Sequence, residues 1–483
     1  MQTFLFYDIE TTGLNKAFDQ VLQFAAIRTD LNLQEIERHE FKVKLNPDVV
    51  PSPRALLTHH IGVADTRDGI SEYDAMRQIH LIMNEPGTIS LGYNTLGFDD
   101  EFLRFGFYRN LLAPYTHQYA NDCARMDLYP ITIMFHLYKN NILEWPRIDN
   151  EIKLKLELIN NSNKLFAGRA HDAMVDVEIT LALTKHFFTE KKMWDYLTGY
   201  YNKFTDEERA RALPTVLESS HGKHQEGLMV LGKIGAAYFY QAPVIFLGDH
   251  KFQKGRTAWL RLDCEDLMKT TPESIKDTTF GFRKKLGEPG FILPLNSHYS
   301  AQLTHDRREL TERNKAWLKQ HPELFNQIIE YHRTFVFTNP PSVDNDAGLY
   351  LNGFWTDEEN ALCRQFQRVA PAEKVTLISR INNPVLKTLA VRLLARNFPE
   401  VLTEDLKQEY QTYLEQAFSD QPEHALIDFQ GNPRLTPRAA LADIETLRLN
   451  GNLSSEQIRQ LTELEEYLLT QLQRVARETN SIG

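Results

Sequence analysis

Apolar and polar residues follow two different periodicities in the first part of the chain. Nearly continuous or alternating apolar runs, which are typical of strands, occupy residues 4–10, 21–30, 39–45 and 88–94. Apolar residues three and four positions apart, which predict helices, occupy residues 71–83, 99–112 and 171–188. This alternation of strands and helices predicts an open α/β sheet with crossover helices over residues 1–190.

The pattern changes after residue 190. Short apolar runs separated by Gly, Asp and Pro turns lie at 227–232, 242–248, 257–263 and 290–296 and predict a mainly β domain. The end of the chain is helical, and its last helix begins with a capping box formed by Ser454 and Gln457. An apolar stripe on that helix, which we interpret as packing within the domain, contains Ile458, Leu461, Leu464 and Leu468. The predicted domains are 1–190, 191–346 and 347–483.

Composition narrows the class of protein. A length of 483 residues favours two or three domains, and 42% hydrophobic with 25% charged residues is ordinary for a soluble globular protein. The three cysteines are far apart and form no metal or disulfide pattern. Because there is neither a signal peptide nor a bilayer-length apolar run, we expect a cytoplasmic protein without a membrane partner. The net charge of −11 argues only weakly against nucleic acid, because local basic patches govern such binding.

Two carboxylates interrupt the first strand. Asp8 and Glu10 are two residues apart, so their side chains point to the same face of the sheet. Two like charges about 4 Å apart repel by about 4 kcal/mol at an effective dielectric near 20. Some other group must offset that cost.

Further acidic and basic residues lie at the ends of other predicted elements. Asp99 and Asp100 follow the strand at 88–94, whereas His171 precedes a helix that carries Asp176 in its first turns. Each has a purely structural alternative: Asp99 or Asp100 as a helix N-cap, and His171 as a surface loop residue. Asp172 is a further candidate for an N-cap.

Taken together these residues resemble a known family. Asp-x-Glu, then Asn-x(3)-Phe-Asp, then His-x(4)-Asp is similar to the DEDDh 3′→5′ exonucleases of the proofreading-exonuclease superfamily. The matched residues are Asp8, Glu10, Asp99, His171 and Asp176. Segments 21–30, 92–115 and 169–177, NGFWTDEE at 352–359 and LARNFPE at 394–400 resemble, more narrowly, the bacterial exodeoxyribonuclease I family.

The resemblance implies a fold and an activity. The fold would be an α/β ribonuclease H-like exonuclease domain, a mainly β SH3-like domain and an all-α C-terminal domain. The activity would be Mg²⁺-dependent 3′→5′ hydrolysis of single-stranded DNA to 5′-mononucleotides, in DNA repair and recombination. The resemblance further implies two Mg²⁺ ions, with Mn²⁺ as a substitute, and a monomeric enzyme.

The implied chemistry accounts for the residue types. Two divalent ions about 3.5–4 Å apart can activate water and stabilise the charge that develops on the phosphate and the leaving oxygen. The expected metal ligands are Asp8, Glu10, Asp99 and Asp176, with Asp8 between both ions and Asp99 acting through water. His171 is the expected proton acceptor, because imidazole side chains titrate near neutral pH. Cations would also offset the repulsion among the carboxylates.

The resemblance also suggests substrate contacts. Glu10, Arg104, Tyr115 and Tyr119 lie where the family meets single-stranded DNA, although the two tyrosines could instead pack in the core. Lys155 stands where the family usually has an arginine that contacts a phosphate. Lysine keeps the positive charge but lacks the planar guanidinium that donates two parallel hydrogen bonds. The basic runs 282–285 and 306–310 have three possible roles: contact with DNA, contact with the acidic C-terminal tail of single-stranded DNA-binding protein, or a solvated surface.

Two other functions stay open. The motif itself does not exclude an exoribonuclease of the same superfamily, because the shape of the pocket decides whether a 2′-OH is accepted. A non-catalytic scaffold that binds single-stranded DNA is the second alternative. The complete set of carboxylates and histidine speaks against the scaffold, because such a protein has no use for buried charge.

Overall fold

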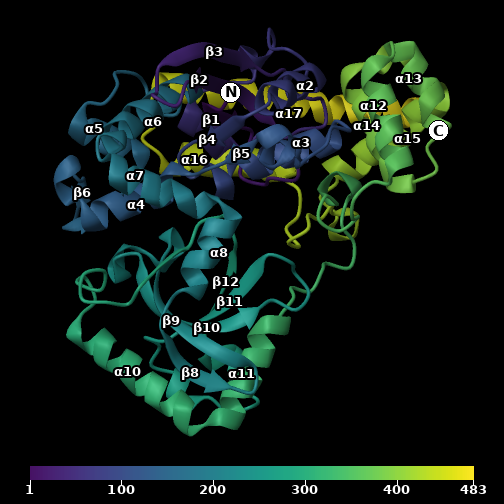
Figure 1. Cartoon of the computed structure of the whole chain (residues 1–483). Helices are drawn as coiled ribbons and strands as arrows, with labels where there is room; N and C mark the ends of the chain where they lie inside the picture. Colours follow the sequence, from purple (N-terminus) through teal and green to yellow (C-terminus); the bar gives the residue numbers. More distant parts are fainter. Residues whose placement is uncertain (483) are drawn as a thin grey trace. The chain divides into compact units, whose positions relative to one another are not determined.

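The computed structural model of the protein describes residues 1–482 and divides into two compact units (Figure 1). The first unit contains Met1–Arg125, Ala167–Glu178 and the chain from Thr338 onward. The second unit contains Met126–Phe166 and Ile179–Phe337. The N-terminal sheet and the C-terminal helices therefore belong to one compact unit although they lie far apart in sequence.

The first unit is built on a sheet with the strand order β3-β2-β1-β4-β5. The strands are β1 (Thr3–Thr11), β2 (Val21–Thr29), β3 (Glu35–Lys42), β4 (Thr88–Leu91) and β5 (Ala124–Arg125). β2 is antiparallel to both β1 and β3, whereas β4 is parallel to β1. Strand β1 therefore has a hydrogen-bonded neighbour on each side, and its apolar residues are almost fully buried.

Helices α2 (Glu72–Met83) and α3 (Asp99–Arg109) contribute to the core on one face of β1. That core includes Leu5, Tyr7, Ile9, Met76, Ile79, Phe102 and Phe107. Because successive side chains of a strand alternate between faces, Asp8 and Glu10 point away from this core. The sheet thus separates the apolar packing of α2 and α3 from the two carboxylates.

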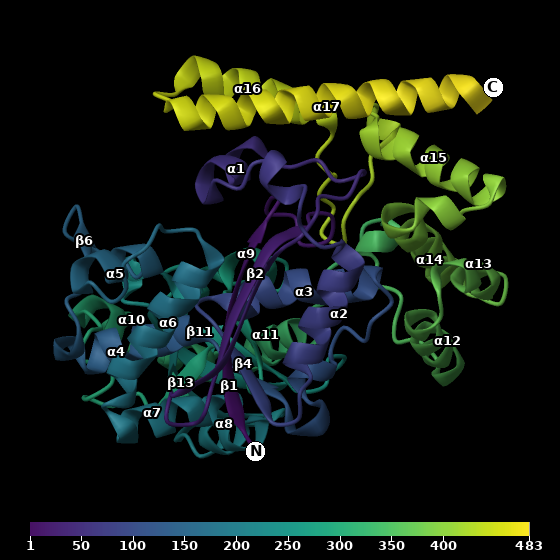
Figure 2. The same ribbon diagram turned by 90° about the horizontal axis from the view of Figure 1, so that it is seen from above.

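The C-terminal helices pack on the N-terminal part of the chain. They are α12 (Asp357–Arg368), α13 (Pro371–Ile378), α14 (Pro384–Asn397), α15 (Glu404–Phe418), α16 (Pro437–Asn450) and α17 (Ser455–Ile482). One buried core joins Phe18, Leu56, Tyr73 and Phe105 to apolar residues of these helices. Figure 2 shows α16 and α17 alongside α1 (Pro53–His59), which both helices contact.

A buried network of charges lies at the junction between the N-terminal part of the chain and the C-terminal helices. The carboxylate of Asp48 accepts hydrogen bonds from Arg396 (2.8 Å) and from the hydroxyl of Tyr413 (2.8 Å), and it lies 3.3 Å from the guanidinium of Arg434. Asp346 pairs with Arg396 at 2.5 Å. Burial alone would raise the pKa of Asp48, but Arg396 and Arg434 hold it well below its usual range. The network therefore depends on charges that lie on both sides of the junction.

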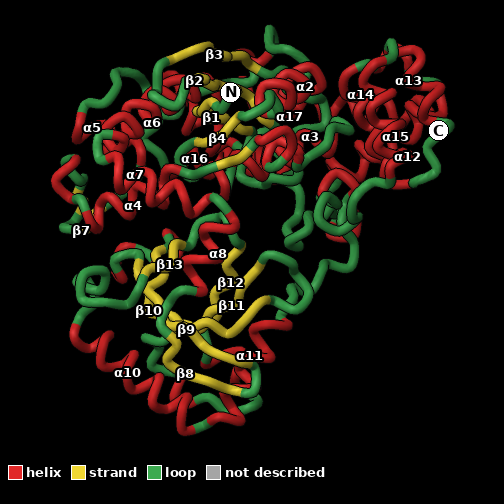
Figure 3. The backbone as a smooth tube through the Cα atoms, viewed as in Figure 1, coloured by secondary structure: helices red, strands yellow, loops and turns green. Residues whose placement is uncertain are grey.

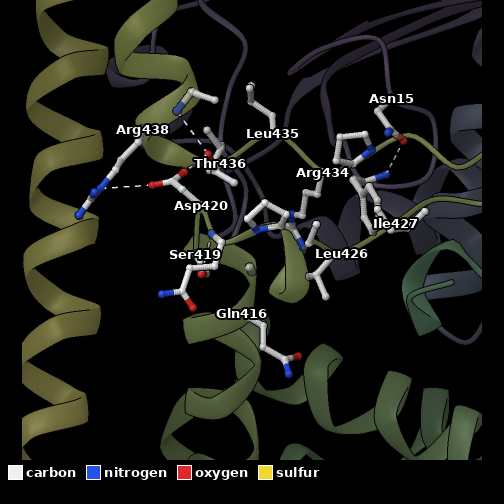
Figure 4. Close-up of a pocket in the computed structure, with 18 of the residues that line it drawn as sticks. Asn15, Gln416, Ser419, Asp420, Leu426, Ile427, Arg434, Leu435, Thr436 and Arg438 are labelled. Atoms are coloured by element: carbon white, nitrogen blue, oxygen red, sulfur yellow. Dashed lines mark hydrogen bonds and ion pairs between the residues drawn. The ribbon is translucent and has the colours of Figure 1, made fainter. Parts of the chain in front are cut away.

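Arg434 also lines a cavity of about 820 Å³ between the segment that joins α15 to α16 and the loop after β1 (Figure 4). On one side of it Asn15 donates to the carboxylate of Asp428 (3.0 Å), and on the other Arg438 pairs with Asp420 (3.2 Å). The polar groups at its edge are thus bonded to one another.

The second unit contains an antiparallel sheet in the order β12-β11-β10-β9-β13, with β8 paired to β9 (Figure 3). Its strands are β8 (Thr215–Ser219), β9 (Gly222–Val230), β10 (Gln241–Asp249), β11 (Arg256–Arg261), β12 (Gly281–Lys285) and β13 (Phe291–Leu293). The unit also contains α4 (Leu128–Tyr138), α5 (Leu156–Asn163), α7 (Lys191–Thr198), α8 (Lys203–Arg211), α10 (His305–Gln320) and α11 (Pro322–Thr334). Helices α10 and α11 pack on β10, β11 and their neighbours through Leu318, Phe325 and Ile329.

Several expectations from the sequence are confirmed and others need correction. The capping box of Ser454 and Gln457 forms, and Leu461, Leu464 and Leu468 are buried within their unit. Ile458, however, is 48% exposed and does not belong to that buried stripe. The third strand ends at Lys42, earlier than expected, and the middle region contains the long helices α10 and α11 as well as strands. Within residues 1–482, no helix is long and apolar enough to cross a membrane.

The basic runs of the middle region also have structural roles. In 282–285, Lys284 forms a fully buried pair with Asp206 (2.7 Å) and Lys285 pairs with Glu288 (2.5 Å). In 306–310, Arg307 pairs with the buried Asp263 (2.6 Å). Lys284, Lys285 and Arg307 are therefore already partnered inside the unit, which weakens the assignment of these three residues to DNA or to an acidic tail.

Replacing Asp48 with Asn should strongly destabilise the protein. Removing one partner of a buried ion network leaves the remaining charges uncompensated, which costs about 3–5 kcal/mol. We expect a loss of this size in the free energy of unfolding, measured by urea titration at pH 7. The control is Glu404→Gln, which breaks an exposed pair with Lys407 and should cost less than about 1 kcal/mol. Equal effects of the two substitutions would contradict a stabilising role for the network.

Candidate active site

Strand β1 holds the first two carboxylates. Asp8 pairs with Ala25 of β2 and Glu10 with Gln23, and the register shifts directly after Glu10. A shift of this kind bends the strand and re-aims its side chains, and such bulges are common beside active sites. Asp8 and Glu10 are both half-buried on the same face. The backbone therefore fixes two carboxylates side by side at the end of a central strand.

The turn after β4 brings in the third carboxylate. Gly92 lies so close to β1 that a Cβ atom there would be 2.5 Å from the carbonyl oxygen of Tyr7, so no larger residue fits without a shift. Helix α3 then begins at Asp99, whose Oδ1 accepts a hydrogen bond from the backbone N–H of Ile9 (3.2 Å). Asp99 is thereby held between the positions of Asp8 and Glu10 on the neighbouring strand.

Helix α6 (Ala173–Phe188) supplies the fourth carboxylate, Asp176, and the loop before it carries the histidine. The carboxylate of Asp172 accepts hydrogen bonds from the backbone N–H groups of Met174 and Val175, so Asp172 is the N-cap that the sequence suggested. The N–H of Ala173 donates to the side chain of Gln23 on β2 (3.3 Å), which ties the start of the helix to the sheet. His171 directly precedes this cap with a left-handed backbone (φ +60°).

These segments bring Glu10, His171 and Asp176 together. One possible ligand atom from each lies within 4.8 Å of the others, a spacing that suits a metal ion. All of the residues expected at the site, Asp8, Glu10, Asp99, His171 and Asp176, lie in the first unit. The structure therefore places the five side chains of the motif in one region, although their catalytic roles stay predictions.

The electrostatics distinguish this cluster from an ordinary ion pair. Burial, together with like-charge repulsion from Asp176 and Asp99, raises the pKa of Glu10 to about 9. Burial likewise raises the pKa of Asp8 well above its usual range, with added repulsion from Asp99, Asp176 and Glu10. Carboxylates that repel one another and face an imidazole are a suitable donor set for a divalent cation, which would stabilise their charged forms.

Asp100, the neighbour of Asp99, is surrounded by cationic side chains. Its buried carboxylate pairs with Arg104 (2.5 Å), with His117 (2.8 Å) and with Arg125. Burial opposes ionisation of Asp100, but Arg125 and Arg104 hold its pKa well below the usual range. Asp100 is thus a structural ion-pair partner that anchors α3, and it does not belong to the candidate metal site.

The expected substrate residues occupy varied positions. Arg104 is buried, paired with Asp100 and Glu101, and stacked over the ring of Tyr115 at 5.7 Å. Tyr115 is partly buried and packs against the core of the first unit, as the core alternative expects, whereas Tyr119 is 68% exposed and does not. Lys155 lies in the second unit, exposed at the N-cap of α5. Contact of these four residues with DNA stays a prediction.

Sequence reasoning missed two aromatic residues beside this group. The hydroxyl of Tyr350 donates to Glu101 (2.6 Å), and the ring of Phe354 meets Tyr115 edge to face at 5.9 Å. Phe354 is 87% exposed, which is unusual for a phenylalanine. In the sequence, the NGFW segment that carries Phe354 indicates only the family resemblance, because nothing local in the sequence shows which residues it contacts.

Comparisons with known proteins agree with this arrangement. A family model described as exonuclease matches residues 5–184, and one described as exonuclease I C-terminal domain matches residues 343–471. Exodeoxyribonuclease I of Escherichia coli is 29% identical over 86% of this chain and 90% of its own length. Exodeoxyribonuclease I of Buchnera aphidicola subsp. Schizaphis graminum is 34% identical over 41% of this chain and 42% of its own.

Solved structures extend the similarity to nearly the whole chain. E. coli exonuclease I in complex with a dA16 oligonucleotide superposes with a TM-score of 0.84 at 24% identity, covering 98% of this chain and all of that one. Exonuclease I from Methylocaldum szegediense gives 0.83 at 25% identity with the same coverage. The predicted ribonuclease H-like α/β exonuclease fold and the presence of an exonuclease I C-terminal domain are thereby confirmed.

The raised pKa of Glu10 predicts how stability varies with pH when no metal is bound. Between its ordinary value of 4.5 and about 9, the folded protein holds a proton that the unfolded chain has released. The free energy of unfolding should therefore fall as pH rises through this window, by up to about 1.4 kcal/mol per pH unit for one proton. Urea titrations from pH 6 to 8.5 with a chelator should show this loss.

Glu10→Gln should reduce that slope, because an amide does not titrate. Exposed Glu218→Gln, in the second unit, is the control and should leave the slope unchanged. Adding a divalent cation should make wild type more stable than Glu10→Gln at pH 8. If Glu10→Gln keeps the wild-type slope, Glu10 is not the source of the pH dependence.

Proposed function

This chain combines an exonuclease domain with an exonuclease I C-terminal domain and so belongs to the exonuclease I family, and we propose that it removes nucleotides from the 3′ end of single-stranded DNA. The products would be 5′-mononucleotides. The observation that carries the proposal is the group of Asp8, Glu10, Asp99, His171 and Asp176 at the end of β1 in an exonuclease domain. Relatives named exodeoxyribonuclease I support DNA as the substrate.

We propose Mg²⁺ as the cofactor, with Mn²⁺ as a substitute. Asp8, Glu10, Asp99 and Asp176 would hold two ions, since hard carboxylate oxygens are the ligands that Mg²⁺ prefers. When bound, such ions lower the pKa of water and stabilise negative charge on a phosphate. The raised pKa values of Asp8 and Glu10 support this assignment, because burial and like-charge repulsion disfavour their charged forms, which a bound cation would stabilise.

His171 would take up the proton of the attacking water. Its position beside Glu10 and Asp176 supports this role. Glu10 would also adjoin the bound 3′ end. Arg104, Tyr115, Tyr119 and Lys155 would contact the strand farther from the reacting phosphate, where exposed aromatic rings can stack on bases.

The remaining expectations from the family resemblance belong to the same proposal. The protein would be a cytoplasmic monomer that acts in DNA repair and recombination and binds the acidic C-terminal tail of single-stranded DNA-binding protein. Its domains would be 1–190, 191–346 and 347–483, and the antiparallel sheet of the second unit would form an SH3-like domain. The two compact units follow other boundaries, because the C-terminal helices share a core with the N-terminal sheet.

Digestion of matched oligonucleotides tests the proposal against its rivals. With Mg²⁺, a 5′-labelled single-stranded DNA should shorten from its 3′ end, while the RNA of the same sequence and the DNA duplex should be cut far more slowly. Faster digestion of the RNA would favour the exoribonuclease. Binding of DNA without any cleavage, in Mg²⁺ or Mn²⁺, would favour the non-catalytic scaffold.

Asp8→Asn should abolish this cleavage and preserve DNA binding. The substitution removes a charge expected between both ions, so we expect a loss of about 10³-fold or more in kcat, whereas affinity for a labelled oligonucleotide in chelator should change by less than about threefold. Asp266→Asn, which breaks an exposed pair with Lys269, is the matched control and should cleave normally. Normal turnover by Asp8→Asn would exclude the two-ion mechanism.

His171→Ala should lower kcat by about 10²–10⁴-fold, the range for loss of a general base. The activity of the wild type should fall at the acid end of its pH profile. The variant should not show this fall, which we call the acid limb. The measurement is single-turnover cleavage of a labelled oligonucleotide from pH 5.5 to 9. A variant that keeps both the rate and the acid limb would remove His171 from the proton transfer.

A further inference from the structure

The last turn of α1 contacts three segments that are distant in sequence. It carries two consecutive histidines, His59 and His60, and the second has a left-handed backbone (φ +62°). Hydrogen bonds from this turn reach the end of β1, the loop that carries His171, and helix α17. All of these segments belong to the first unit. No part of this turn belongs to the sequence motif of the candidate active site.

The ring of His59 fixes the end of β1. The backbone N–H of Ile61 donates to Nδ1 of His59 (3.0 Å), so Nδ1 is an acceptor and Nε2 carries the hydrogen. Nε2 then donates to the carbonyl oxygen of Thr11 (3.1 Å), the residue that follows Glu10 at the register shift. The side chain of His59 is only 3% exposed, and burial lowers its pKa to about 4. It is therefore a neutral ring with both nitrogens bonded.

The backbone of the same residue holds the histidine loop. The guanidinium of Arg169 donates to the carbonyl oxygen of His59 (3.1 Å) and lies 4.0 Å from the carboxylate of Glu456 on α17. Arg169 is two residues before His171. The loop is thus attached to α1 on one side of His171, while Asp172 caps α6 on the other side.

Helix α17 also forms a hydrogen bond to this turn. The side chain of Gln460 donates to the carbonyl oxygen of His60 (2.7 Å), and Gln460 is only 2% exposed. Figure 2 shows α17 running along α1, and the two helices are in direct contact. Buried polar groups are usually bonded, and this bond links the C-terminal helix to the active-site face of the protein.

We propose that His59 is a positioning residue of the exonuclease reaction: with Gln460 and Arg169 it fixes Glu10 and His171 relative to each other. The inference rests on the proposed function. It assigns to the C-terminal helix α17 a part in the geometry of catalysis, separate from any contact that it makes with DNA. Residues that orient metal ligands or a general base typically affect rate by about 10–100-fold.

A merely structural role would act differently. Loss of packing at His59 would lower stability and reduce the fraction of folded enzyme, but every folded molecule would still turn over normally. Loss of positioning would lower kcat of the folded enzyme while KM for the oligonucleotide changed little, because His59 does not reach the substrate. The two roles are therefore separated by comparing kcat with the unfolding midpoint.

Two substitutions at His59 each keep one of its two ring hydrogen bonds and remove the other. His59→Asn places an amide oxygen near the Nδ1 position, so it can still accept from Ile61 but cannot reach Thr11. His59→Gln places an amide N–H near the Nε2 position and can still donate to Thr11. We expect His59→Asn to lower kcat by about 10–100-fold and His59→Gln to stay within about threefold of wild type, with KM changed by less than about threefold in both.

His250 offers a matched control in the second unit. Its Nε2 donates to the carbonyl oxygen of Phe335 (2.9 Å) and its Nδ1 accepts from the N–H groups of Phe252 and Gln253 (3.2 Å each). It is 5% exposed, which is close to the burial of His59. His250→Asn should lower the unfolding midpoint about as much as His59→Asn and leave kcat per folded molecule unchanged.

A second variant covers the case in which His59→Asn does not fold. Gln460→Ala removes the support from α17 and should lower kcat by about 3–10-fold, whereas Gln473→Ala, an exposed residue of the same helix, should have no effect. Wild-type kcat in His59→Asn, or in Gln460→Ala if His59→Asn does not fold, would overturn the proposal, as would an equal fall in kcat for His250→Asn. Absence of cleavage by the wild type would instead refute the proposed function itself.

Discussion

Mutual repulsion among the carboxylates at the end of β1 is the constraint on which the rest of the first unit depends. Asp8 and Glu10 share a face of the strand, Asp99 is bonded to the backbone between them, and Asp176 adds a further charge. Side chains in this state would move apart if their backbones allowed it. The central position of β1, the close approach of Gly92 and the capped start of α6 together prevent that. The rigid scaffold thus maintains an arrangement that is unfavourable without cations.

The protein handles buried acids in two ways within a few residues. Asp99 is kept among like charges, whereas Asp100 receives two arginines and a histidine. The buried core between the N-terminal part of the chain and the C-terminal helices shows the second way. There Asp48 and Asp346 form ion pairs with Arg396, and Asp48 also pairs with Arg434. Acids with cationic partners stabilise the fold, and the clustered acids are found where a metal ion is expected. The like-charge repulsion around Asp8 and Glu10 is thus a local feature of the site.

The sequence sufficed for those features that local periodicity determines. Asp8 and Glu10 share a face because the strand period is two, and the helix that starts at Ser454 follows from its capping box. Features set by distant contacts could not be predicted. The role of Asp100 depends on His117 and Arg125, the bond from His59 to Thr11 spans 48 residues, and Ile458 is exposed because of how α17 lies on its neighbours. The long helices α10 and α11 were missed because short strand-like runs suggested a mainly β region.

The shared core at the junction has a consequence for biosynthesis. Asp48 is completed by Arg396 and Arg434, which follow it by 348 and 386 residues. At translation rates of 5–20 residues per second, the N-terminal sheet waits roughly 20–80 seconds for these partners. During that interval the apolar surface around Phe18, Leu56 and Phe105 has no covering helices and Asp48 has no counter-charge. The nascent chain therefore cannot complete its first unit until most of it has left the ribosome, and over that period it exposes apolar surface of the kind that chaperones bind.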